Sequence, residues 1–232
     1  MISIASIISC NNFPMPLPAD VLALRDRLPV KPEAVTLTGR IVVLRPLVDH
    51  DFEALHAVSS GEPFTLGARS IGAYDPDEQI WKWMFGGRFD TAAALGAYLA
   101  AFAANPDVRT LTVCDRATSA PIGVASLMAN RPADLKIELG SIWYGPIAQG
   151  TGASREATLL MCAHLFGLGY RRVEWKCDAR NERSRRAALS YGFTFEGIQE
   201  QHMIVKGDNR DTAWFRMLAS EWPAIRARWE AT

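Results

Sequence analysis

Glycines gather directly before a predicted helix, in the segment 145–154. Gly145, Gly150 and Gly152 follow a strand-like segment, and an amphipathic helical pattern begins after them. The first N–H groups of a helix have no partner inside the helix, and the helix dipole adds positive charge there. The segment therefore predicts an anion site that suits a pyrophosphate. A plain tight turn explains the same glycines, and neither the P-loop pattern nor the complete dinucleotide fingerprint is present.

The four cysteines give no sign of a metal site. Cys10, Cys114, Cys162 and Cys177 are far apart and form no Cys-x-x-Cys pair, so neither a zinc site nor a disulfide framework is expected. His164 lies two residues after Cys162, and the spacing of the two matches no set of metal ligands. We expect no metal, and buried thiols in a reducing cytoplasm.

Charge and hydropathy exclude two kinds of partner. The chain has 25 basic and 25 acidic residues, so its formal net charge is +0, and no global positive field is available to bind nucleic acid. No apolar run reaches the roughly 18 residues of a membrane-spanning helix. A hydrophobic fraction of 49% is enough for a substantial core. We expect neither a nucleic-acid partner nor a membrane partner.

Prolines dominate the first part of the chain. Five of them lie between Pro14 and Pro32 and leave room only for a short helix near 19–27. The apolar segment 1–10 has no basic residue before it, unlike a secretory signal, and Met15 is a plausible alternative start. We predict an irregular N-terminal arm at 1–38 and one domain at 39–232.

Periodicity predicts the elements that must position the glycine segment. Strands are expected at 40–46, 109–115, 121–128, 135–144, 171–178, 193–205 and 211–218. Helices are expected from Asp49 or Asp51, after Asp90, and at 151–168 and 181–191. Short connections make 109–144 an antiparallel meander, whereas the strand, helix and strand between 135 and 178 imply a parallel pair. The predicted fold class is α/β (α+β): a mixed, mostly antiparallel sheet with helices on both faces.

Two motifs together resemble the GNAT superfamily of acetyltransferases. Gln149-Gly-Thr-Gly-Ala-Ser154 resembles its Gln/Arg-x-x-Gly-x-Gly/Ala signature, and the segment 181–197 is similar to the Asn-x-x-Ser…Gly-Phe-x-x-Glu-Gly block of its RimJ/RimL-type branch. The resemblance runs from about Thr36 to the C-terminus. The segments 169–178 and 202–212 are also similar to the acetyltransferase domain that gives self-immunity to microcin C. Two departures are Ser154, which puts cofactor affinity in question, and Ala188, where many relatives have a tyrosine acid.

The resemblance implies acetyl-CoA as co-substrate, with its pyrophosphate on the glycine segment and its pantetheine arm along the preceding strand. For Arg186, the alternative to a phosphate contact is a place on a solvated basic face. The implied cofactor-binding residues are Ile142, Trp143, Tyr144, Gln149, Gly150, Thr151, Gly152, Ala153, Ser154, Asn181 and Arg186.

The implied reaction is acetyl transfer to a primary amine by direct attack in a ternary complex, without a covalent enzyme intermediate. Ser184 is the candidate acid, although it also fits the first turn after an Asn181 cap. Glu138 is the candidate base, acting through a water; a salt-bridged carboxylate is the alternative, and an amine that arrives deprotonated needs no base. His202 is a candidate base or substrate contact, with a structural strand residue as the alternative.

Trp81, Trp83 and Phe85 form an aromatic cluster in the least regular part of the domain. They are candidates for stacking on a flat acceptor such as a nucleobase, and an aromatic core is the alternative. The acceptor stays open among a protein N-terminus, an aminoacyl-nucleotide, an amino acid and a polyamine, and so does the oligomeric state. A non-catalytic acyl-CoA sensor is the alternative function. A dinucleotide oxidoreductase is disfavoured because no acidic ribose-binding residue follows a strand at the required distance.

Overall fold

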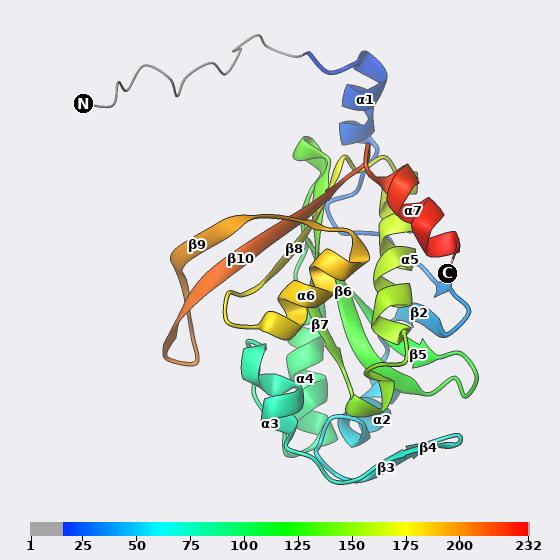
Figure 1. Ribbon diagram of the computed structural model, residues 1–232, viewed down its shortest axis with the longest axis vertical. Helices are drawn as coiled ribbons and strands as arrows, with labels where there is room; N and C mark the ends of the chain where they lie inside the picture. The colour runs from blue at the N-terminus through cyan, green and yellow to red at the C-terminus, as the bar shows by residue number, and fades with distance from the viewer. Residues whose placement is uncertain (1–15, 232) are drawn as a thin grey trace.

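One 8-stranded sheet runs through the chain, and the structure, a computed structural model, describes residues 16–231 of it (Figure 1). The positions of Cys10 and Met15, and with them the first part of the predicted arm, lie outside the described residues. In spatial order the strands are β1 (Leu37–Thr38), β2 (Val42–Pro46), β5 (Arg109–Asp115), β6 (Pro121–Arg131), β7 (Lys136–Tyr144), β8 (Arg172–Asp178), β10 (Asp208–Leu218) and β9 (Thr194–Val205).

Helices cover both faces of this sheet. The α-helices are α1 (Ala19–Ala23), α2 (Phe52–Ala57), α3 (Pro76–Gln79), α4 (Ala92–Ala103), α5 (Ala153–Gly167), α6 (Glu182–Tyr191) and α7 (Trp222–Glu230). Short 3₁₀ segments are η2 (Leu24–Asp26), η3 (Asp49–Asp51), η4 (Trp81–Trp83), η5 (Pro132–Asp134) and η6 (Pro146–Ala148). Helix α5 packs with α6 and α7 on one face, and α2 packs with α4 on the other (Figure 1).

The predicted fold class is confirmed. Strands β7 and β8 pair in parallel, from Lys136 with Arg172 to Leu139 with Trp175, and the other pairings of the large sheet are antiparallel. Helix α5 makes the crossover between the parallel strands, as the strand, helix and strand pattern predicts.

Three features lie beyond the predicted elements. A small hairpin of β3 (Phe64–Leu66) and β4 (Arg69–Ile71) forms within the segment expected to be irregular. Helix α7 follows the last strand. Strand β1 already pairs with β2 inside the range predicted as an arm. Two other described residues of that range are tied to the domain: Asn130 donates to the carbonyl oxygen of Pro29 at 2.9 Å and Arg109 to that of Pro32 at 2.8 Å.

The core is apolar on both sides of the sheet. Leu111, Ile137 and Val173 are 0% exposed on neighbouring strands. Leu95 on α4 and Met161 on α5 are equally buried, one on each face. Burial of a side chain of this size stabilises the fold by about 1.5–3 kcal/mol, so both helix layers are held firmly against the strands that carry the site.

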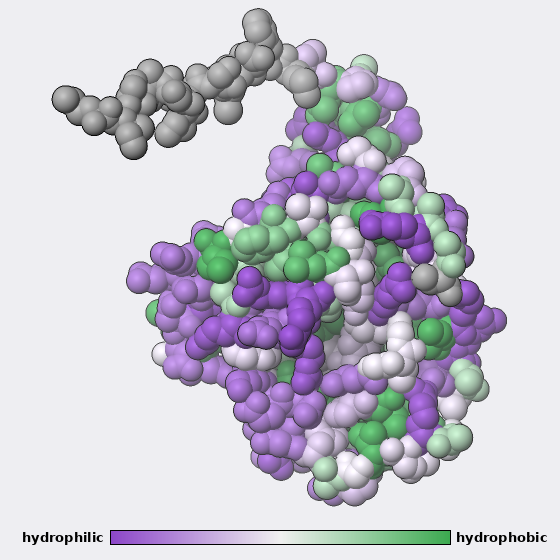
Figure 2. Space-filling model, in the orientation of Figure 1, coloured by the Kyte–Doolittle hydropathy of each residue, from purple (hydrophilic) through white to green (hydrophobic). Residues whose placement is uncertain are grey.

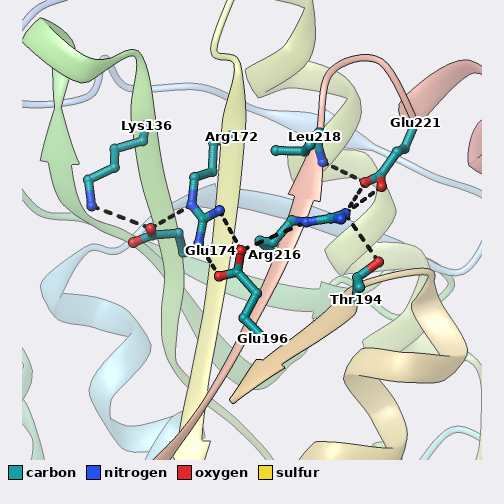
Figure 3. Close-up of polar contacts among 8 residues, drawn as sticks. All are labelled: Lys136, Arg172, Glu174, Thr194, Glu196, Arg216, Leu218 and Glu221. Atoms are coloured by element: carbon teal, nitrogen blue, oxygen red, sulfur yellow. Dashed lines mark hydrogen bonds and ion pairs between the residues drawn. The ribbon is translucent and has the colours of Figure 1, made fainter. Parts of the chain in front are cut away.

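Charged residues tie the four strands β7, β8, β10 and β9 together near the start of β8 (Figure 3). Glu174, 4% exposed, accepts from Arg172 at 2.7 Å and from Lys136 at 3.3 Å. Arg172 also pairs with Glu196, and Arg216 pairs with Glu221 and Glu196. A buried carboxylate with several cationic partners holds its neighbours in one geometry. The charged cluster therefore holds the strands together near the start of β8. It does not reach the far end of β8, where β7 and β8 stop pairing.

The surface of the molecule is a mixture of polar and apolar groups. Figure 2 shows apolar side chains gathered over strand β9, where Phe195 and Ile198 are 41% and 46% exposed. Polar groups cover most of the remaining face in that view, as expected for a sequence with balanced charge.

Candidate active site

The site lies where the parallel strands stop pairing. Beyond Leu139 and Trp175 no β7–β8 pair exists in the described chain, although β8 continues along β10 to Asp178. A bulge at Ser141, whose φ is 48°, shifts the pairing of β7 with β6 between Gly140 and Trp143. A bulge bends its strand and increases the twist. The main-chain edge of β7 that faces β8 is therefore left open.

A cavity of about 750 Å³ occupies this opening. Its wall includes the end of β7, the end of β8, the glycine loop and the first turns of α5 and α6. The segment from Glu78 to Phe85 closes it on a further side. This segment is held at two points, because Arg183 donates to the carbonyl oxygen of Gln79 at 3.3 Å and Lys206 to that of Trp81 at 2.8 Å.

The glycine loop presents unpaired amides at the start of α5. Gly150 and Gly152 have φ values of 74° and 86°, in the region that glycine adopts without strain. No hydrogen bond in residues 16–231 uses the N–H groups of Gly150, Gly152, Ser154 or Arg155. Such amides at a helix start bind phosphate oxygens. The loop therefore has the unpaired amides that the predicted anion site requires.

Helix α5 is fixed in place by a buried acid in its first turn. Glu156, 4% exposed, accepts from the main-chain N–H groups of Arg40, Ile41 and Val42 at 2.7, 2.7 and 2.9 Å. These charge-assisted bonds join the helix start to the beginning of β2. The orientation of the unpaired amides is therefore set by the fold and needs no ligand.

The structure brings most of the predicted cofactor residues to the cavity wall. The wall includes Ile142, Trp143, Tyr144, Gln149, Gly150, Ser154, Asn181 and Arg186. Thr151, Gly152 and Ala153 lie outside it: the Thr151 hydroxyl donates to the carbonyl oxygen of Ala148 at 2.7 Å, and Ala153 is 1% exposed. These three residues shape the turn, and of them only Gly152 offers a free amide.

The hydroxyl of Ser154 has a protein partner. Tyr191, on α6, donates to Ser154 Oγ at 3.0 Å, and burial raises the pKa of the Tyr191 hydroxyl, which keeps it protonated. Sequence reasoning did not select Tyr191. The bond joins the first turn of α5 to the last turn of α6, so the departure from the signature at residue 154 serves to connect the two helices.

Ser184 lies on the cavity wall, and it also lies in a capped first turn. Its N–H donates to Asn181 Oδ1 at 3.1 Å, which is a helix cap. Its hydroxyl oxygen accepts from the indole nitrogen of Trp175 at 3.0 Å. The two readings of this serine are compatible, because the cap uses its main chain and the cavity meets its side chain.

Glu138 is buried and has a close cationic partner. It is 6% exposed, lines the cavity, and its carboxylate lies 2.6 Å from Nζ of Lys176. Burial raises the pKa of Glu138 above its ordinary value of 4.5, although Lys176 opposes that change. A carboxylate with a raised pKa accepts a proton more readily, as a general base must.

His202 is not on the cavity wall, so the structure does not bring this candidate to the site. Its Nδ1 lies 2.8 Å from the Thr212 hydroxyl, and its ring lies beside that of Trp214. Burial and the nearby Lys176 and Arg210 lower its pKa. Strand β9 carries the residue along β10 rather than toward β7, which the sequence alone does not reveal.

The aromatic cluster divides between the core and the cavity. Trp81 is 1% exposed, donates to the carbonyl oxygen of Ser59 at 3.2 Å and packs edge-on against Phe89. Trp81 is therefore a core residue, and the prediction that it contacts substrate does not hold. Trp83 and Phe85 do line the cavity, and Phe85 is 52% exposed.

Arg210 is a cavity residue that sequence reasoning did not select. It lies on β10, is 7% exposed, and reaches the wall beside Phe85. Its strand period puts it on the same face as Thr212 and Trp214. The alternation of residues along β10 can be read from the sequence. The fact that β10 lies beside β8 cannot.

Residues 16–231 contain no group of three or more His, Cys, Asp or Glu side chains placed to hold a metal ion. In the same range, no helix has the length and apolar character required to cross a membrane.

Comparison with known proteins agrees with this geometry. Residues 42–194 match the model of the acetyltransferase (GNAT) domain family. A GCN5-related N-acetyltransferase from Brucella melitensis is 39% identical, with a TM-score of 0.78 over 87% of this chain and 86% of that one. A structure from Chromobacterium violaceum described as GNAT family is 31% identical, with a TM-score of 0.77 over 91% and 97%.

A more distant neighbour is similar in fold alone. It is an acetyltransferase from Salmonella typhimurium that modifies the N-terminal serine of a ribosomal protein of the 50S subunit. It is 17% identical, with a TM-score of 0.65 over 79% of this chain and 99% of that one. No curated protein matches this chain.

Proposed function

Since this chain belongs to the GNAT family of acetyltransferases, we propose that it moves an acetyl group from acetyl-CoA to a primary amine in a ternary complex. The observation that carries the proposal is the continuity of the cavity. The same cavity is lined by Gly150 and Ser154, which have free amides, by Ser184 and by Glu138. One cavity can therefore hold a diphosphate carrier at one end and an amine at the other.

The chain's own groups would hold acetyl-CoA as follows. The free amides of Gly150 and Ser154, both on the cavity wall, receive the pyrophosphate, and Arg186 on α6 is a further phosphate contact. The open main-chain edge of β7 from Ile142 to Tyr144 offers hydrogen-bonding groups that β8 does not use. The bound thioester supplies the acetyl group.

Transfer requires one bond to form and one to break. The amine nitrogen bonds to the thioester carbonyl carbon as the carbon–sulfur bond breaks; the nitrogen loses a proton and the sulfur gains one. Glu138 takes the amine proton through a water, and the Ser184 hydroxyl gives a proton to the sulfur. Solvent then returns a proton to Ser184. Positioning of the two reactants supplies much of the rate.

We further propose that the chain belongs to the RimJ/RimL-type branch of the family. The support is the Asn181 to Gly197 block, with Asn181 and Ser184 at the cavity wall. A cytoplasmic location is the third part of the proposal. It is supported by the buried free thiols of Cys114, Cys162 and Cys177, which suit a reducing compartment.

The test is thiol release from acetyl-CoA with a panel of amines, together with the mass of the acetylated product. The panel includes free amino acids, spermidine, a peptide with a free N-terminal serine and aspartyl-sulfamoyl adenosine. Release above the amine-free rate, with a product heavier by one acetyl group, is the expected result. Calorimetric binding of acetyl-CoA without release for any amine would instead indicate a non-catalytic binding module.

A further inference from the structure

Arg210 is a buried cation that makes no hydrogen bond or ion pair through its side chain within the described residues. The side chain is 7% exposed, and its Nε is buried with no hydrogen bond. Across residues 16–231, no hydrogen bond or ion pair uses any of its side-chain nitrogens. Its guanidinium carbon lies 4.8 Å from the centroid of the Phe85 ring, and the nearby carboxylates of Glu138 and Asp178 attract it without a hydrogen bond. Burial of a charge without a compensating partner is costly.

The acids beside Arg210 are already occupied. Glu138 pairs with Lys176 at 2.6 Å. Asp178 accepts from both Nε and a terminal nitrogen of Arg180, at 3.0 and 2.9 Å. Each buried carboxylate on this wall therefore has its own cation, and Arg210 is left as an additional positive charge.

The surroundings of Arg210 suit a ligand rather than a protein anion. It lines the same cavity as Glu138, the proposed base, and the two are close enough for Arg210 to act on the Glu138 pKa. Trp83 and Phe85 provide aromatic surface on the adjoining wall. A planar guanidinium binds carboxylate or phosphate oxygens in a bidentate manner, and such bonds are strong where water is excluded.

We propose that Arg210 binds an oxyanion of the acceptor, so that the substrate is a small amine carrying a carboxylate or a phosphate near its nitrogen. This inference rests on the proposed acetyl transfer and specifies its acceptor. Arg210 selects the acidic group and Glu138 takes the proton of the amine. An acceptor without the oxyanion would leave the guanidinium buried and unpaired.

The test uses matched acceptors that differ only in the oxyanion. The pairs are amino acids against their amides, and phosphoethanolamine against ethanolamine. The enzymes are the unmodified chain, Arg210→Gln, Arg210→Lys and the control Arg226→Gln, which changes an exposed residue of α7. We expect the unmodified chain to prefer the acidic member of a pair. Arg210→Gln should lower kcat/KM for that member by about tenfold or more, mainly through KM, and should change the value for the uncharged member far less, so that the preference for the acidic member is lost.

The two pairs distinguish a carboxylate from a phosphate. The pair that shows the larger preference for its acidic member identifies the group that Arg210 binds. Thermal melting separates ligand binding from a structural role. Loss of an unpaired buried charge should leave the melting temperature of Arg210→Gln equal or higher, whereas a structural cation would lower it. Arg210→Lys should keep part of the preference, because it retains the charge without the planar fork.

Failure of this inference differs from failure of the proposed function. Equal use of acidic and uncharged acceptors by the unmodified chain would overturn the inference and leave acetyl transfer intact. If no amine is acetylated, calorimetry with CoA-loaded protein decides. Binding of an N-acetyl amino acid or of phosphoethanolamine that disappears in Arg210→Gln supports the oxyanion site, and absence of binding by all of these probes rejects it.

Discussion

The indole nitrogen of Trp175 donates to the hydroxyl oxygen of Ser184 at 3.0 Å. Trp175 is the last residue of β8 that pairs with β7, so this bond connects the point where the strands separate to the first turn of α6. An indole N–H donates only. The serine oxygen is therefore the acceptor in this bond, and the bond does not use the serine's own proton.

Ser184→Ala should lower kcat by about tenfold or more while affinity for acetyl-CoA stays nearly the same. The substitution removes the proton donor, whereas the Asn181 cap uses the main-chain N–H and survives. Steady-state kinetics and calorimetry with acetyl-CoA measure the two quantities. Ser190→Ala, on an exposed part of the same helix, is the control. An unchanged kcat in Ser184→Ala would remove this serine from the mechanism.

Glu138→Gln should abolish the acidic limb of the pH profile. Burial raises the pKa of Glu138 above 4.5, and only the deprotonated form is a base. The kcat/KM of the unmodified enzyme should therefore rise with pH through that raised pKa and then level off. In Glu138→Gln the rate should be lower by about 10²-fold or more, without this limb.

The pH profile is measured as kcat/KM at a series of pH values for both enzymes. Glu200→Gln, an exposed change on β9, serves as the control and should keep the limb. A Glu138→Gln enzyme with the same profile as the unmodified chain would show that the amine loses its proton elsewhere.

Gly150→Ala should weaken acetyl-CoA binding, and Gly207→Ala should not. Both glycines have positive φ, 74° and 85°, and a Cβ at either one meets nothing within 4 Å. The two substitutions therefore share the same backbone penalty, about 1 kcal/mol each. Only Gly150 adjoins the free amides at the start of α5.

Chemical denaturation and calorimetry separate the two effects. Similar losses of unfolding free energy, with a rise in the dissociation constant of acetyl-CoA in Gly150→Ala alone, are expected. Equal affinities in both variants would place the pyrophosphate away from this loop.

Asp51→Asn should destabilise the fold by about 3 kcal/mol near neutral pH. Asp51, 1% exposed, accepts from Arg45 at 2.8 and 2.5 Å and from the Thr112 hydroxyl at 2.7 Å. Burial alone would raise the pKa of Asp51, but these hydrogen bonds outweigh it and bring the pKa below 3.8.

A lowered carboxyl pKa gives stability that is present above pH 3.8 and is lost as pH falls through the folded-state value. Unfolding free energy measured across acidic pH should show this loss in the unmodified chain and not in Asp51→Asn. Asp49→Asn, exposed in the same turn, is the control. A pH dependence that persists in Asp51→Asn would assign the acid loss of stability to other carboxylates.

Much of the site could be predicted from local sequence. Gly150 and Gly152 before an amphipathic helix predict free amides, because helix starts and positive φ are local properties. Asn181 and Ser184 lie three residues apart, so the cap was visible in the same way. The sequence left substrate stacking and an aromatic core open for Trp81, Trp83 and Phe85, because all three are aromatic and close in the chain; only packing separates the core ring of Trp81 from the two cavity rings.

The amino-acid order alone determined most strands and helices of the large sheet, the parallel crossover through α5 and the glycine loop, because these depend on periodicity and on residues near one another in the chain; β1, the β3–β4 hairpin and α7 were not among them. Tertiary structure decided which side chains meet. It pairs Lys176 with Glu138, bonds Tyr191 to Ser154, and puts Arg210 on the cavity wall without an ion-paired acid. These relations join β7, β8, α6 and β10 across many residues, and they follow from strand order and register. Side-chain partners across a sheet are set by which strands lie together, which no local pattern encodes.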